Sequence, residues 1–108
     1  MTSDEGALSG AAELFKALSA TSRLLILRAL AHEPSSVSAL TGTTGMSQPL
    51  VSQHLRLLRG TNLVTATKAG RETIYSLTDD HVARVIQDAI AHSQERQVSG
   101  STQRRRTS

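Results

Sequence analysis

One short stretch of β-forming sequence lies among helical segments, and this arrangement most constrains the fold. Residues 63–68 and 72–77 are rich in Thr, Val, Ile and Tyr, and Ala69-Gly70-Arg71 separates them. Two such runs around a glycine turn predict a β-hairpin. Helical segments precede the hairpin and one follows it. The sequence therefore predicts a mainly α fold with a small β-hairpin, in the order α-α-α-α-β-β-α.

The helical segments are marked by apolar spacing, caps and breakers. The expected helices cover residues 7–18, 23–31, 36–43, 47–59 and 80–95. Residues 19–22 (Ser-Ala-Thr-Ser) are expected to cap the second helix, and Ser47 the fourth. Gly60 fits the C-terminal cap of the fourth helix. The polar ends, 1–6 and 97–108, are expected to be disordered, which leaves 7–96 as one folded domain.

Composition excludes several functional classes. The chain has 108 residues and no cysteine, so disulfides and thiolate metal sites are absent. No apolar run approaches the ~20 residues that span a membrane. The first ten residues lack a basic-then-apolar signal pattern. We therefore expect a soluble cytoplasmic protein with no membrane partner.

The charge is segregated along the chain. The net charge of +3 comes from Arg104, Arg105 and Arg106, because residues 1–99 hold equal numbers of basic and acidic side chains. Residues 47–78 are basic, whereas residues 79–95 are acidic. This pattern predicts one face that binds anions and another that binds cations.

Four potential metal ligands lie near the two ends of the last predicted helix, in the pattern Asp79-x-His81 … His92-x-x-Glu95. His81 and His92 fall on nearly the same side of a helix but ~16 Å apart along its axis. Metal ligands must lie within ~2.0–2.2 Å of the ion, so the two ends are half-sites. An antiparallel second copy of the helix could join them, which makes any metal site here a bridge across a dimer. Alternatively, Asp79 only favours the helix N-terminus, and His92 with Glu95 forms a solvated pair.

Residues 36–59 form the outline of a helix-turn-helix, a short helix and a longer one joined by a glycine-containing turn. The longer helix has an inward stripe of Val51, Leu55 and Leu58, and its opposite arc is polar. Amides and hydroxyls near its start suit base edges, and guanidiniums further along suit phosphates. The hairpin resembles a wing. The candidate DNA-binding residues are Ser47, Gln48, Ser52, Gln53, Arg56, Lys68 and Arg71. The alternative is that this arc is an ordinary solvated helix face. His54 is expected to be packed and hydrogen-bonded rather than to contact bases.

The chain resembles the ArsR/SmtB family of metal-responsive winged-helix repressors. The resemblance rests on residues 17–27, residues 46–58, the wing segment with Gly70-Arg71 and 74–77, and the four-ligand pattern above. It implies a homodimeric winged helix-turn-helix whose first and last helices build the interface. It also implies that Gln48, Ser52 and Gln53 contact DNA.

The same resemblance implies the metal chemistry. Asp79, His81, His92 and Glu95 match the family's last-helix site, where metal bound across the dimer weakens operator binding. A second family site uses two cysteines, and Ser36 and Ser38 occupy those positions here. The resemblance further implies a relay in which His92 donates to a backbone carbonyl near Asn62. Two imidazoles and two carboxylates favour Zn(II), with Ni(II) or Co(II) as alternatives.

These observations predict a metal-sensing transcriptional repressor rather than an enzyme. Its expected partners are double-stranded operator DNA and a second copy of the chain, with no small-molecule substrate. One alternative is a winged-helix DNA-binding protein that senses no metal. Another is a small hydrolase using Asp79 and His81, which is disfavoured because no nucleophile or oxyanion motif accompanies them.

Overall fold

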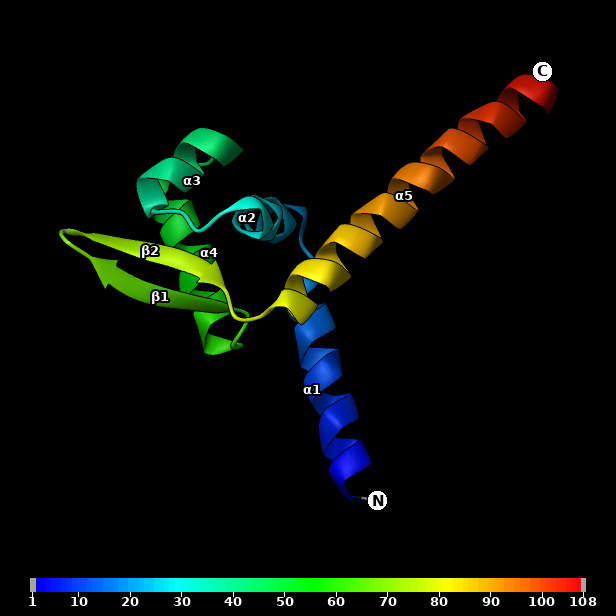
Figure 1. Cartoon of the computed structure of the whole chain (residues 1–108). Coiled ribbons are helices and arrows are strands. Elements are labelled where there is room, and N and C mark those ends of the chain that lie inside the picture. Colours follow the sequence, from blue (N-terminus) through cyan, green and yellow to red (C-terminus); the bar gives the residue numbers. More distant parts are fainter. Residues whose placement is uncertain (1, 108) are drawn as a thin grey trace.

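Helices form most of the fold, and one antiparallel hairpin projects from them (Figure 1). The structure is a computed structural model that describes the backbone of residues 2–107 and the side chains of residues 4–97. The elements follow the predicted order. They are α1 (Thr2–Leu18), α2 (Thr21–His32), α3 (Val37–Thr44), α4 (Gln48–Gly60), β1 (Val64–Ala69), β2 (Glu72–Leu77) and α5 (Asp80–Thr107).

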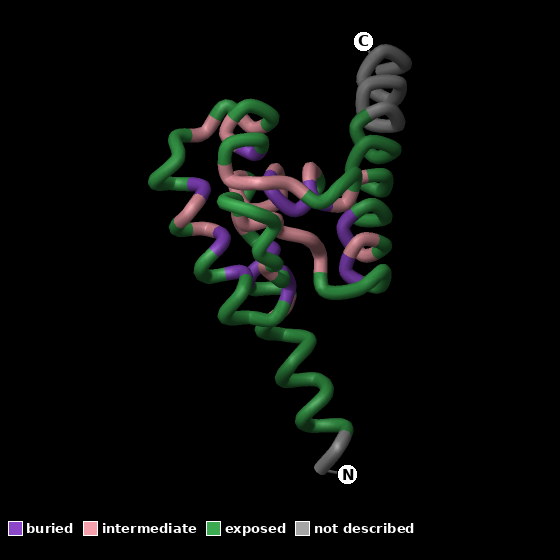
Figure 2. Tube along the Cα trace, turned by 60° about the vertical axis from the view of Figure 1, so that its left-hand side comes forward, coloured by how far each residue is buried: buried purple, intermediate pink, exposed green. Residues whose placement is uncertain are grey.

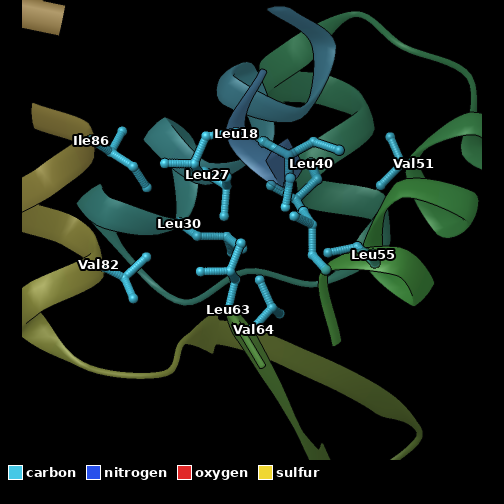
Figure 3. Packing of buried hydrophobic residues seen from close by; sticks show 13 residues of the cluster. Leu18, Leu27, Leu30, Leu40, Val51, Leu55, Leu63, Val64, Val82 and Ile86 are labelled. Atoms are coloured by element: carbon cyan, nitrogen blue, oxygen red, sulfur yellow. The ribbon is translucent and has the colours of Figure 1, made fainter. Parts of the chain in front are cut away.

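Helix α2 lies at the centre and contacts α1, α3, α5 and β2. Its Ile26 and Leu27 are fully buried, and Leu40 of α3 and Ile86 of α5 are buried with them (Figure 3). Each fully buried aliphatic side chain contributes about 1.5–3 kcal/mol relative to exposure. This shared core fixes α3 and α4 against the base of the hairpin, so the elements that carry the candidate site form one unit.

Helices α1 and α5 extend beyond this core (Figures 1 and 2). Among the described side chains of α1, those at its C-terminal end, Ala17 and Leu18, are buried, whereas Leu8 and Phe15 are 71% and 60% exposed. Along α5, the fully buried side chains of the described part are confined to its first two turns. Isolated helical arms gain little stability without a packing partner, and both arms present surface for one.

The two ends of the chain differ from the prediction. Helix α1 begins at Thr2 rather than residue 7, and α5 continues past residue 95 to Thr107. Asp4 and Glu5 in the first turn of α1 favour an early start, because acidic side chains stabilise helix N-termini. The side chains of residues 98–108 lie outside the described residues. The limits of the folded domain, 7–96, stay a prediction.

Two predicted caps are wrong in detail. The residue that caps α2 is Ala20, which has no side chain to donate or accept a hydrogen bond. Arg23 of α2 joins this turn to α1, because its Nε donates a hydrogen bond to the carbonyl of Ala17 at 2.7 Å. Gly60 is the last residue of α4, and Thr61 is its C-terminal cap, with the following Asn62 at a φ of 65°. In the part of the chain that the structure describes, no helix has the length and apolar character to cross a membrane.

Candidate nucleic-acid interface and metal half-sites

Helix α4 is held in place by caps on both sides of a three-residue turn. Gly45 ends α3 in the left-handed conformation, with a φ of 76°, which glycine adopts without steric cost. Ser47 then caps α4 by accepting a hydrogen bond from the amide of Leu50 at 3.4 Å. Pro49 lies in the first turn, where its missing amide hydrogen is tolerated. The predicted helix-turn-helix is therefore confirmed, and its second helix has a fixed start.

The two faces of α4 are divided as the sequence predicts. Val51, Leu55 and Leu58 are buried in the core. The candidate DNA-binding residues at the start of this helix and along it lie outside the core. Ser52 is half-buried, and the exposed ones are Ser47, Gln48, Gln53 and Arg56. Arg59 is also exposed. The arc runs from amides and hydroxyls at the start of the helix to guanidiniums near its end.

The hairpin has the form of a wing. The strands β1 and β2 pair from Val64 with Leu77 to Ala69 with Glu72. The tip is a two-residue turn in which Gly70 has a φ of 65°, a conformation that disfavours other residues. Arg71 at the tip and Lys68 beside it are both exposed. The wing thus presents two exposed cations at and beside its tip.

A hollow between α4 and the wing contains a residue that the sequence analysis did not assign. Its volume is about 460 Å³, and Tyr75 of β2 lines it. The remaining lining comes from α4 and consists of Ser52, Arg56, Arg59 and Gly60. The spacing of these four along α4 marks one helical stripe, but the sequence alone does not indicate which strand residue faces it.

The expectation for His54 is half right. The residue is partly buried on the core side of α4, as predicted, but its Nε2 atom is buried without a hydrogen-bond partner. Burial away from water, and then the positive charge of Arg23, hold the pKa of His54 below its usual value of 6.5. A charged imidazolium would leave a buried N–H at Nε2 without an acceptor among the described residues. His54 therefore behaves as a neutral packing residue rather than a hydrogen-bonded one.

The first pair of predicted metal ligands lies together at the start of α5. Nδ1 of His81 and Oδ1 of Asp79 are 3.8 Å apart, and both side chains are exposed. The same Oδ1 atom accepts a hydrogen bond from the amide of Val82 at 3.0 Å, so Asp79 is the N-terminal cap of α5. Its second oxygen remains for a ligand. The cap holds the carboxylate through one oxygen, on a side chain that is exposed.

The second pair, His92 and Glu95, lies three residues apart on an exposed part of α5. No group of three or more potential metal ligands occurs within the described part of a single chain. The structure therefore brings Asp79 to His81 but does not join this pair to His92 and Glu95. The donor types fit a divalent metal ion, but the arrangement fits one only where two half-sites from different copies meet.

The two serines at the positions of the family's cysteine ligands, Ser36 and Ser38, lie at the start of α3. Ser36 caps α3, because its hydroxyl accepts a hydrogen bond from the amide of Ala39 at 3.1 Å. Ser38 is exposed in the first turn of the same helix. Ser36 thus stabilises the start of α3, and neither serine offers a thiolate ligand.

The first half-site is tied to the end of α4. Thr78, directly before Asp79, donates its hydroxyl to the carbonyl of Asn62 at 2.6 Å. Its amide donates to the carbonyl of Leu63 at 3.0 Å. The predicted relay runs from His92 to a backbone carbonyl near Asn62, and the carbonyl of Asn62 itself already accepts a hydrogen bond from Thr78. A second lone pair on that oxygen stays available.

Residues 21–66 match the family of bacterial regulatory proteins described as the arsR family. The HTH-type transcriptional regulator NmtR of Mycobacterium tuberculosis is 43% identical over 84% of this chain and 76% of its own length. This chain belongs to the ArsR family. The resemblance inferred from the sequence is confirmed.

Other members of the ArsR family extend the comparison. The HTH-type transcriptional repressor SmtB of M. tuberculosis is 41% identical over 82% of this chain, and the match spans 65% of that repressor's length. Among solved structures, the homodimeric winged helix-turn-helix DNA-binding domain of a possible ArsR-family regulator from Mycobacterium bovis is similar, with 30% identity and a TM-score of 0.79. That match covers 86% of each chain. The winged helix-turn-helix fold predicted from the sequence is therefore confirmed.

Proposed function

We propose that this ArsR-family chain is a homodimeric transcription regulator, whose binding to double-stranded operator DNA is weakened by Zn(II) held across the dimer. The observation that carries the DNA-binding part is the exposed polar arc of α4 beside a cationic wing. Its relatives are named as transcriptional regulators and repressors, which supports a regulator over the alternative of a small hydrolase.

Residues of the exposed arc of α4 suit two kinds of DNA contact, with base edges and with backbone phosphates. Gln48 and Gln53 carry amides that can pair with adenine edges in a major groove. Arg56 lies one turn further along and suits a backbone phosphate, and Arg71 at the wing tip can reach a phosphate or a minor groove. Base contacts give sequence preference, whereas phosphate contacts give affinity that falls with salt.

Dimerisation is supported by the two helical arms. The large apolar side chains of Leu8 and Phe15 on α1 are exposed in the single chain, at 71% and 60%. Covering them would stabilise the assembly, because exposed apolar surface of this kind marks interaction sites. The M. bovis relative is described as homodimeric. A two-fold dimer would place two copies of α4 about one DNA turn apart, ~34–36 Å, on successive major grooves.

The dimer would also complete the metal site. Asp79 and His81 of one copy would meet His92 and Glu95 of the other, and the two-fold axis generates two such sites. Two imidazoles and two carboxylates suit tetrahedral Zn(II), and Ni(II) or Co(II) is the alternative. The bound ion supplies a cross-link between the copies. Asp79 is pre-positioned for this role because its other oxygen already caps α5.

The route from metal to DNA begins at Thr78. Its bonds to Asn62 and Leu63 join the first half-site to the end of α4, so a shift at Asp79 moves the base of the recognition helix. Within one chain, His92 lies ~18 Å along α5 from Asp80. The implied relay from His92 to a backbone carbonyl near Asn62 therefore requires a second copy. A coupling of about 1–3 kcal/mol would change DNA affinity about 5–150-fold.

A metal titration tests this function. Duplexes from the promoter region are titrated with protein by fluorescence anisotropy, without metal and with Zn(II) or Ni(II). We expect tight metal-free binding that weakens with metal, and loss of this response in His92→Ala. His32→Ala, an exposed histidine outside both half-sites, is the matched control. Binding that ignores both metals would favour the alternative of a DNA-binding protein that senses no metal.

A further inference from the structure

The hollow between α4 and β2 has the chemistry of an anion site. Its lining includes Arg56 and Arg59, which carry guanidiniums, and Ser52 and Tyr75, which carry hydroxyls. Neither guanidinium forms an ion pair within the described side chains, where the one pair present joins His81 to Asp79. The hollow thus gathers cationic and hydroxyl-bearing residues, and among the described residues its lining holds no carboxylate.

The strand side of the hollow is rigid. Tyr75 pairs with Ala66 of β1 on one side. On its other side it forms a bridge with Ser35, with its amide donating at 2.8 Å and its carbonyl accepting at 2.9 Å. Its ring packs against the core. The backbone of Tyr75 is held on both sides and its side chain is packed, so little further freedom is lost when its hydroxyl binds a ligand.

The cationic lining continues toward the wing. Directly paired residues of an antiparallel hairpin share a face, and so do residues two apart on one strand. Lys68 pairs with Thr73, and Ala66 pairs with Tyr75, so Lys68 is on the Tyr75 face of the hairpin. A path of positive charge therefore leads from the end of α4, past the hollow, toward the wing tip.

This chemistry selects a phosphate group. Planar guanidiniums match the oxygens of a phosphate in a two-bond geometry, and they remain charged at any physiological pH. DNA, the polyanion of the proposed function, would lie against the same arc of α4. A DNA strand whose bases face Gln48 and Gln53 would carry its backbone past the other end of this helix, between α4 and the wing.

We propose that the hollow between α4 and β2 is a phosphate seat, in which Arg56, Arg59 and the Tyr75 hydroxyl hold one phosphate of the DNA backbone. The proposal rests on the proposed DNA-binding function and deepens it. It assigns Arg59 and Tyr75 as DNA contacts and makes the joint between recognition helix and wing part of the binding surface. Because a phosphate is present in every sequence, this contact raises affinity without reading bases.

Gly60 offers a test that leaves the proposed contacts in place. It lines the hollow, and a Cβ atom added there meets nothing within 4 Å. Gly60→Glu adds a carboxylate at the hollow, and Gly60→Gln adds a neutral side chain of the same size as the matched control. Affinity for a random-sequence 30-base-pair duplex is measured by fluorescence anisotropy at several salt concentrations. We expect Gly60→Glu to bind at least about tenfold more weakly than Gly60→Gln, because like charges at an interface repel strongly.

Two further variants address the contacts directly. Arg59→Gln should weaken binding and lower the slope of log affinity against log salt by about one, which is the loss of one phosphate contact. Tyr75→Phe keeps the ring in the core and removes only the hydroxyl, so affinity should fall while the slope stays. Equal binding by the two Gly60 variants, with an unchanged slope for Arg59→Gln, overturns the phosphate seat.

The outcomes separate this proposal from the proposed function. If the wild-type chain binds duplex DNA and the variants do not differ, DNA binding stands and the seat is wrong. If the wild-type chain binds no duplex DNA, the proposed function fails first. A parallel titration of the DNA-free protein with inorganic phosphate, followed by the amide resonances of Gly60 and Tyr75, tests a free anion as the occupant. Saturable shifts together with unaltered DNA binding by the variants would assign the hollow to a small anion instead.

Discussion

Thr78 donates its hydroxyl to the backbone carbonyl of Asn62 across a distance of 2.6 Å. Asn62 has a φ of 65° and separates the last turn of α4 from β1, and Thr78 directly precedes the metal half-site at Asp79. Asparagine tolerates this left-handed conformation better than most residues do. The hydrogen bond therefore holds an unusual backbone joint next to a ligand that a second copy of the chain would engage.

We expect Thr78→Val to separate metal binding from DNA release. The variant keeps the shape of the side chain and leaves Asp79, His81, His92 and Glu95 in place, so metal affinity should change less than threefold. The fall in DNA affinity caused by metal should shrink, because the bond that ties the half-site to α4 is gone. Isothermal titration with Zn(II) and anisotropy titrations with and without metal measure the two effects.

Thr65→Val is the control for Thr78→Val. It also removes a threonine hydroxyl, one that lies 3.1 Å from the Ser76 hydroxyl within the wing. Each variant should lose about 0.5–1.5 kcal/mol of unfolding free energy, as expected for one hydrogen bond. An intact metal response in Thr78→Val would remove this bond from the coupling route.

The two half-sites predict complementation between variants that each lack one half. Chains carrying Asp79→Ala and His81→Ala should bind metal weakly as homodimers, and so should chains carrying His92→Ala and Glu95→Ala. A mixed dimer brings one intact pair from each chain together and should recover one strong site per dimer. Equilibrium dialysis of the mixture against Zn(II) measures the recovery. Failure to recover any site, with heterodimers verified by mass, contradicts a metal bound across the dimer.

Base reading and phosphate binding should respond differently to mutation. Gln53→Ala should cost about 1–3 kcal/mol of binding free energy at its preferred sequence and leave non-specific binding nearly unchanged. Arg71→Ala should weaken binding to all duplexes alike and lower the salt slope by about one. Parallel titrations of promoter and random-sequence duplexes give both quantities. The opposite pattern would exchange the roles of α4 and the wing tip.

Local rules were sufficient for most of the fold. Apolar spacing located the buried stripe of α4, the serine at 47 located its start, and Gly70 located the hairpin turn. Each feature depends on residues close in sequence, which is where such rules are informative. The cap of α2 was wrong because the helix begins one residue earlier than the flanking serine and threonine suggest, after Ala20, whose methyl group cannot accept a hydrogen bond.

Less of the candidate site than of the fold could be predicted from the sequence, because parts of it depend on contacts between residues far apart in the chain. The stripe of Ser52, Arg56 and Arg59 was visible as a helix face, but the facing strand residue depends on the register of a hairpin and its bridge to Ser35. The hydrogen bond of Thr78 to Asn62 likewise joins residues 16 positions apart. Contacts of this kind need the packed structure, because no spacing along the chain specifies them.

His54 links the core to solution pH. Its Nε2 atom is buried without a partner, and both burial and the charge of Arg23 lower its pKa from the usual 6.5. In the unfolded chain a histidine takes up a proton near pH 6.5. Below that pH the unfolded state therefore binds more protons at this position than the folded state does, and unfolding is favoured as pH falls. Above it, both states are neutral and His54 makes no pH-dependent contribution.

We expect His54→Gln to remove this component of the acid sensitivity. Glutamine is polar and cannot titrate, so the wild-type chain should lose more unfolding free energy than the variant between pH 7.5 and pH 5.5. The exposed histidines at 32, 81 and 92 are present in both proteins and cancel in the difference. Urea unfolding followed by circular dichroism, repeated across this pH range at constant protein concentration, gives the two curves. Parallel curves would mean that the folded protein accommodates a charged His54, in conflict with its buried and unpartnered nitrogen.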